Sequence, residues 1–322
     1  MENVIESEKG SIENENVSQY KPTQTYRVLE FIFLLLTTII LGVALLASSL
    51  SNVEGAGFKN TTGAISDIYY TQITPAGWTF TIWGIIYTAQ VLWIIYGWSF
   101  VFRPATPQAI SFVTYIFYGF ANICNLIWIY LWGNLYPEVA FGIIALCSIS
   151  LYATVIAQAI HLYRETPALS STKKFKIDLY LSRIIVLNSV AIYAAWVTTA
   201  TQLNFVILLV YYGGVDATTA STVGLSILLV AIIVYFILEN TILDRFARFV
   251  FIVYPLFIWA FSGALSAHWG VEEDNRNPIF TLVLLVLCVV LFIVRIILWI
   301  VFAFVRPLAV PTSKIACQLC DV

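Results

Sequence analysis

Residues 73–87 read ITPAGWTFTIWGIIY, and this stretch opens one of the long apolar runs of the chain. It carries two tryptophans, a tyrosine and a proline, although a plain run of leucines would cross a bilayer equally well. So much aromatic surface inside an apolar run indicates that these side chains do more than span a membrane. The other apolar runs of the chain indicate what these aromatic side chains contact.

Composition places the chain among membrane proteins. Hydrophobic residues make up 60% of the sequence and charged residues 11%, against about 45–50% and about 25% in soluble domains. Apolar runs of about 20 residues recur, which is the length needed to cross a bilayer core of about 30 Å. In lipid, the backbone N–H and C=O groups must form hydrogen bonds within the protein, as they do in a helix or a closed β-barrel. The alternating apolar pattern of a β-barrel is absent, so the runs are predicted to be helices. The predicted fold class is an all-α, polytopic helical membrane protein.

The apolar runs predict about eight transmembrane helices. Their ranges are 28–50, 76–100, 110–132, 138–162, 181–208, 222–239, 249–268 and 279–304. The sixth is short, and the preceding YYGGVDATTAS (211–221) could instead form a re-entrant turn. Residues 1–27 are polar and predict a disordered cytoplasmic tail with no signal peptide, so the first span acts as an uncleaved signal anchor. Residues 306–322 form a second tail.

Charge gives the orientation, because Lys and Arg gather on the cytoplasmic side of a membrane. With eight spans, twelve basic residues fall on one side: Lys9, Lys21, Arg27, Arg103, Arg164, Lys173, Lys174, Lys176, Arg245, Arg248, Arg306 and Lys314. Only Lys59 and Arg276 fall on the other. Both termini are therefore predicted to be cytoplasmic. The N-terminal tail does not resemble a mitochondrial transit peptide, which favours the plasma membrane or a secretory-pathway membrane. Asn60 begins a glycosylation acceptor pattern on the predicted outer side.

Catalytic and metal-binding patterns are sparse. Cys124, Cys147 and Cys288 lie within predicted spans as small apolar residues. Cys317 and Cys320 form a lone C-x-x-C, which lacks the further ligands of a zinc site. No activated nucleophile or pair of carboxylates is evident, so we expect no enzyme, no metal site and no nucleic-acid partner.

Three spans carry stripes of aromatic, polar and small residues at helical spacing. The stripes are Trp83, Tyr87, Gln90, Ile94 and Trp98; Ala121, Asn125, Trp128 and Trp132; and Ser189, Tyr193, Trp196, Ala200 and Leu203. Trp98 and Trp132 lie near span ends, where tryptophans usually anchor the membrane interface. Asn125 lies deep in its span, so its amide should meet a protein partner or a cavity.

These motifs resemble the tryptophan-rich sensory protein family, which includes the mitochondrial translocator protein. The resemblance rests on Asn125-Leu126-Ile127-Trp128, on Tyr193-Ala194-Ala195-Trp196 followed by Leu203-Asn204, and on Trp83-Gly84-Ile85-Ile86-Tyr87. It covers about residues 28–210. The chain departs from the family at Thr74-Pro75, where two prolines are usual, and in the first loop, which lacks tryptophans.

The resemblance implies a five-helix translocator-like bundle over residues 28–210 with an aromatic-lined pocket. The ligands it implies are flat and apolar, in the porphyrin, haem or sterol class. Family position assigns the pocket to Trp78, Phe80, Trp83, Tyr87, Asn125, Trp128, Tyr193, Trp196 and Asn204. A three-helix extension at 211–305 has no counterpart in the five-helix members. The lipid bilayer is an expected partner, and a homodimer remains open.

Arg295 lies inside the last predicted span and supports an alternative function. As an anion site it would serve a transporter of lipophilic or anionic metabolites that uses the extra helices. A buried arginine can also be structural. Glu239 and Asp216 lie at other predicted depths, so a structural Arg295 is expected to contact backbone carbonyls.

Overall fold

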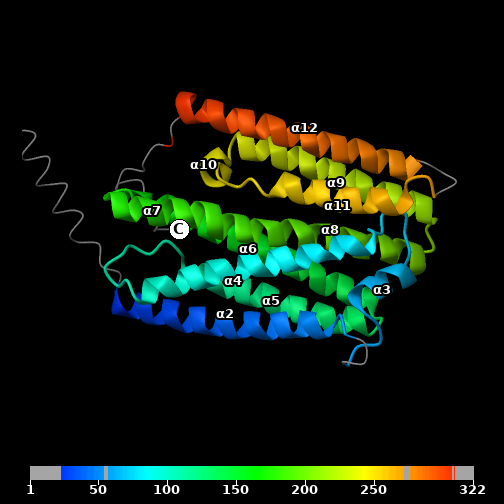
Figure 1. Cartoon of the computed structure of the whole chain (residues 1–322), viewed down its shortest axis with the longest axis horizontal. Coiled ribbons are helices and arrows are strands. Elements are labelled where there is room, and N and C mark those ends of the chain that lie inside the picture. The colour runs from blue at the N-terminus through cyan, green and yellow to red at the C-terminus, as the bar shows by residue number, and fades with distance from the viewer. Residues whose placement is uncertain (1–22, 54–56, 272–275, 307, 309–322) are drawn as a thin grey trace, which may run out of the picture.

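The computed structural model describes residues 23–53, 57–271, 276–306 and 308, and the elements in these ranges are helical. Long helices run roughly side by side along the molecule (Figure 1). In chain order they are α2 (Gln24–Leu50), α3 (Thr62–Ile68), the 3₁₀ helix η1 (Gly77–Thr81), α4 (Ile82–Val101), α5 (Phe112–Gly133), α6 (Pro137–Leu169), α7 (Lys173–Leu181), the π-helical turn η2 (Ser182–Val186), α8 (Leu187–Tyr211), α9 (Ala217–Asn240), α10 (Asp244–Ala247), α11 (Val253–His268) and α12 (Arg276–Val305).

The predicted all-helical membrane fold is confirmed. Seven helical stretches in the described ranges are long and apolar enough to cross a bilayer. The eighth predicted span, 249–268, corresponds to α11, which has 16 residues and lies among the other helices. Large apolar side chains such as Leu46, Ile95 and Ile149 are exposed on the outside of the bundle, as a lipid-facing surface requires.

Two groups of helices pack against each other. In the first, α5 packs against α2 and α6, while α8 packs against α4 and α6. In the second, α12 packs against α9 and α11. Both α9 and α11 also pack against α8, so α8 is buried between the groups. This position explains why an almost unbroken run of α8, Ser189–Val197, is buried.

Two predicted boundaries are corrected by the structure. The re-entrant turn considered before the sixth span is wrong, because α9 is a regular 24-residue helix whose N-terminus is capped by the Asp216 carboxylate. The preceding link reverses direction at Gly214, whose φ of 65° suits glycine. The fifth span, predicted at 181–208, begins too late, because the helical stretch starts at Lys173 and runs through α7 and η2 into α8.

The basic elements gather at one end of the molecule. The start of α2, helix α7 and helix α10 share that end, whereas α3 and the start of α12 lie at the other (Figure 1). Arg103, which follows α4, forms an ion pair with Asp178 of α7 at 2.9 Å. This placement agrees with the predicted sorting of charge. The predicted disordered tail, residues 1–27, ends too late, because residues 24–27 already belong to α2; residues 1–22, Cys317 and Cys320 lie outside the described residues.

A short segment before α4 enters the bundle between the two groups of helices. Pro75 precedes η1, and the Ala76 N–H donates a hydrogen bond to the Gly263 carbonyl of α11 at 3.1 Å. A Cβ on Gly263 would overlap the Thr79 side chain, so glycine there lets η1 approach α11 closely. Residues of ITPAGWTFTIWGIIY therefore connect the two helix groups before the run continues as α4.

Candidate functional site

Aromatic side chains from η1, α4 and α8 converge on Trp83. Its ring stacks on Tyr87 with centroids 5.3 Å apart, and it meets Tyr193 and Trp196 edge-on at 6.0 and 6.2 Å. Phe80 contacts Trp196 edge-on at 6.3 Å. Such edge-to-face and stacked arrangements are the preferred geometries of aromatic pairs. The stripes predicted on the second and fifth spans therefore face each other inside the bundle.

Helix α5 closes the other side of this cluster. Trp128 is buried and stacks on Trp132 at 5.7 Å. The Asn125 amide donates to the Tyr87 hydroxyl at 3.2 Å, which supplies the partner that a deeply placed amide needs. Asn125 thus links α5 to α4 and holds the Tyr87 ring against Trp83.

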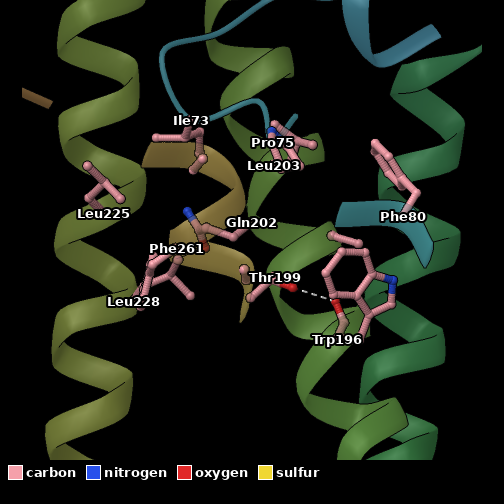
Figure 2. A pocket seen from close by; sticks show the side chains of 13 residues that line it. Ile73, Pro75, Phe80, Trp196, Thr199, Gln202, Leu203, Leu225, Leu228 and Phe261 are labelled. Carbon is pink, nitrogen blue, oxygen red and sulfur yellow. Dashed lines mark hydrogen bonds between the residues drawn. The ribbon is translucent and has the colours of Figure 1, made fainter. Parts of the chain in front are cut away.

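The largest of three small cavities beside the cluster has a volume of about 70 Å³. Figure 2 shows Trp196 and Thr199 of α8 on one side of it and Leu225, Leu228 and Phe261 on the other. Phe80 lies at its edge next to Trp196. The wall is almost entirely apolar, which suits an apolar group better than a polar one.

Two further cavities lie on the α5 side of Phe80. One, of about 50 Å³, is bounded by Trp83, Tyr87, Trp128 and the end of α2. The other, of about 20 Å³, lies between Trp83, Trp128 and Trp196. Phe80 lines all three cavities. Its ring therefore divides what would otherwise be a more continuous space.

Several buried polar atoms along these cavities have no hydrogen-bond partner in the described part of the chain. They are the indole nitrogens of Trp128 and Trp196, the side-chain oxygen of Asn204 and the amide nitrogen of Gln202. Each residue lines at least one cavity. Buried polar groups are normally hydrogen-bonded, so unpaired ones beside a cavity are suited to orient a ligand.

Not every residue assigned by family position joins the cluster. Trp78 is 44% exposed, packs edge-on against Trp259 of α11 at 5.0 Å and donates to the Ser266 hydroxyl. It therefore lies on the α11 side of η1, outside the cavity walls. Trp132, predicted as an interface anchor, is instead buried and donates to the Thr62 carbonyl at 3.2 Å. The anchor interpretation fails there because α3 folds over that end of α5.

The cavity walls supplied by the last helices were not predicted from the sequence. Leu225 and Leu228 of α9 and Ala260, Phe261 and Ala264 of α11 line the largest of the three cavities beside the aromatic cluster. The signal lay in the stretch VYPLFIWAFSGAL (253–265), where alanine and glycine recur at helical spacing and permit close packing. Without a predicted neighbour for α11, nothing in the sequence indicated which helix those small residues would approach.

Arg295 lies away from the aromatic cluster and is fully buried. Its guanidinium donates to the Asn240 side chain at 2.8 Å and to the Ala247 carbonyl at 2.9 Å, and lies 3.5 Å from the Glu239 carboxylate. The carbonyl contact was expected, but the exclusion of Glu239 by depth was wrong. Helix α12 extends past the end of α9 (Figure 1), and the contact between the two side chains places Arg295 at the depth of Glu239. These contacts favour a structural role over an open anion site.

Comparisons with known proteins bear on the whole bundle. A family model described as TSPO-like protein matches residues 32–299, which includes most of the last three helices. Searches among curated proteins and among solved structures each gave no significant match. The family match spans well over half of the chain and agrees with the motifs on α4, α5 and α8. The chain therefore belongs to the TSPO-like protein family.

Proposed function

We propose that the protein binds a flat, largely apolar ligand of the porphyrin, haem or sterol class in the space divided by Phe80. The observation that carries the proposal is the convergence of aromatic rings and unpaired polar atoms on three adjacent cavities. Rings from Trp83 and Trp196 offer faces and edges to a planar ligand. The Trp128 and Trp196 N–H groups can donate to a carboxylate or hydroxyl oxygen of such a ligand.

Binding requires a rearrangement, because pockets for drug-sized ligands measure about 300–1,000 Å³. The largest cavity of the cluster is about 70 Å³. Phe80 is the side chain to move, since it lines all three cavities and sits on a short 3₁₀ helix. Such helices have poorer hydrogen-bond geometry than α-helices and commonly mark points of adjustment. Movement of η1 would join the cavities and open them toward α11.

The test is a titration of the purified full chain with protoporphyrin IX, haemin and cholesterol in lipid nanodiscs. Saturable binding of one ligand per chain to at least one of them, competed by unlabelled ligand, supports the proposal. Partition into nanodiscs that does not exceed partition into empty nanodiscs, for all three compounds, overturns it. The empty-nanodisc control is essential because these compounds dissolve in lipid by themselves.

Transport of an anionic metabolite is not favoured. The Arg295 guanidinium is enclosed by Asn240, Ala247 and Glu239, and no cavity described near the aromatic cluster includes it. A buried arginine already paired with a carboxylate offers little attraction to a second anion.

A further inference from the structure

A separate cavity lies at the end of the bundle where α2 begins. Its volume is about 170 Å³, larger than any of the three cavities around Phe80. Helices α2 and α4 and the loop that follows α4 enclose it. Its lining residues are Arg27, Glu30, Phe31, Leu34, Gly97, Phe100, Val101 and Gln108. Most of this wall is apolar, and its polar residues are Arg27, Glu30 and Gln108.

Two buried side chains on this wall carry oxygen atoms that accept no hydrogen bond from the described part of the chain. Glu30 is 5% exposed and Gln108 is 3% exposed. The side-chain oxygen of Gln108 has no hydrogen-bond partner in the described part of the chain. Nor does any described group donate a hydrogen bond to, or form an ion pair with, the Glu30 carboxylate. Arg27, one turn earlier on α2, donates to the Pro104 carbonyl, so its charge acts on Glu30 without a direct hydrogen bond.

A third oxygen lies behind the same wall. The Tyr115 hydroxyl is buried without a partner among the described residues. It lies 2.5 Å from the place where a Cβ on Gly97 would be, so the glycine is what admits it to this position. Side-chain oxygens of Glu30 and Gln108 therefore line the cavity, with the Tyr115 hydroxyl behind Gly97, and the charged donor on the same wall is Arg27.

This chemistry selects the charge of a ligand. A carboxylate removed from water is stable only beside a cation and is otherwise protonated, so an ionised Glu30 favours a cation in the cavity and disfavours an anion. A calcium ion takes about 6–8 oxygen ligands, more than this wall provides. A primary ammonium needs only about three acceptors for its three N–H bonds. The cavity volume of about 170 Å³ is several times the roughly 30 Å³ that one water molecule occupies in the liquid. The cavity therefore has room for a group larger than a single water.

We propose that this cavity binds a primary ammonium group, with Glu30 and Gln108 as its acceptors. Arg27, half-buried at the mouth, would hold an anionic group attached to the amine. A phosphoethanolamine group has this combination of charges. It could come from a phosphatidylethanolamine headgroup or from a soluble phosphoethanolamine. Phe31 and Val101 line the cavity and are also exposed on the apolar outside of the bundle, which gives a lipid headgroup a route inward.

The two sources are separated by two measurements on the full chain. The first is native mass spectrometry after release from nanodiscs with equal phosphatidylethanolamine and phosphatidylcholine. Choline carries the same phosphate but no N–H, so it is a matched control ligand. The second is calorimetric titration of O-phosphoethanolamine and phosphocholine into protein held in phosphatidylcholine nanodiscs. We expect a preference of about tenfold for the ethanolamine compound in at least one measurement.

Variants assign the preference to this cavity. Glu30→Gln should abolish it, whereas Glu138→Gln, an exposed glutamate on the first turn of α6, should leave it intact. Val101→Trp should also abolish it by filling the mouth while the Glu30 carboxylate remains, which covers the case in which Glu30→Gln fails to fold. Equal binding of ethanolamine and choline compounds in both measurements would mean that the cavity holds only water and would overturn the proposal. Retained preference in Glu30→Gln would overturn it as well.

Discussion

The Trp259 indole N–H donates a hydrogen bond to the Thr79 carbonyl at 2.9 Å, which joins α11 to η1. Two more hydrogen bonds join α11 to the segment that leads into η1. The Ala76 N–H donates to the Gly263 carbonyl, and the His268 ring donates to the Thr74 carbonyl at 2.9 Å. The segment that carries Phe80 is thus held by a helix of the second group. This gives α11 a role in fixing one wall of the cavities.

Trp259→Phe should loosen η1 while it keeps an aromatic ring in place. Loss of one hydrogen bond removes about 1 kcal/mol, and the lost contact restrains a single short helix. We expect faster hydrogen exchange in peptides that cover residues 76–82, measured by mass spectrometry. Trp299→Phe, on α12 beside Phe251, is the matched control and should leave that exchange unchanged. Equal exchange in wild type and Trp259→Phe would show that α11 does not restrain η1.

Phe80→Ala should speed ligand entry, because Phe80 divides the three cavities. We expect the association rate of protoporphyrin IX to rise by about threefold or more in stopped-flow fluorescence, a change of about 0.7 kcal/mol in the barrier. Phe102→Ala removes a ring that is exposed at the end of α4 and serves as control. A slower rate in Phe80→Ala would indicate that the ring is a contact for the ligand and not a barrier.

Arg295→Met should destabilise the packing of α9 and α12. The substitution leaves the Glu239 carboxylate buried without its cation, which costs about 3–5 kcal/mol in comparable buried pairs. The double variant Arg295→Met with Glu239→Gln should recover much of that loss, because no charge remains buried. Thermal unfolding in detergent measures both. If the double variant is no more stable than Arg295→Met, the two residues do not act as a pair.

The predicted orientation can be tested at Asn60. This residue lies just before α3, at the opposite end of the bundle from α7 and the start of α2 (Figure 1). If both termini are cytoplasmic, Asn60 is on the translocated side and can be glycosylated. Expression in a eukaryotic cell should then give a band that glycosidase treatment shifts, and Asn60→Gln should remove the shift. If a consensus site introduced in the loop before α7 is glycosylated and Asn60 is not, the orientation is the opposite of the predicted one.

Much of the fold follows from local properties of the sequence. Apolar length located the spans, and helical spacing correctly indicated that Trp83, Trp128 and Trp196 face inward. Both signals depend on residues close together in the chain. The start of α9 was placed too late because threonine, serine and alanine at 217–222 give a weak apolar signal, although Asp216 is a good helix cap.

The parts that the sequence did not predict depend on contacts between distant segments. Trp78 shares the motif region with Trp83, but η1 is a 3₁₀ helix, so its residues do not continue the angular spacing of α4. The pairing of Arg295 with Glu239 depends on how far α12 extends past α9. The walls from α9 and α11 depend on both helices docking on α8. None of these quantities is encoded in local periodicity.

The central claim is that the rings around Phe80 form the binding site, and titration of Trp83→Leu and Trp196→Leu with protoporphyrin IX tests it most directly. Quenching of the remaining tryptophan fluorescence reports the affinity, and Trp299→Leu is the control. We expect each pocket variant to weaken binding by about tenfold, or about 1.4 kcal/mol, with Trp299→Leu unchanged. Wild-type affinity in both Trp83→Leu and Trp196→Leu would contradict the account.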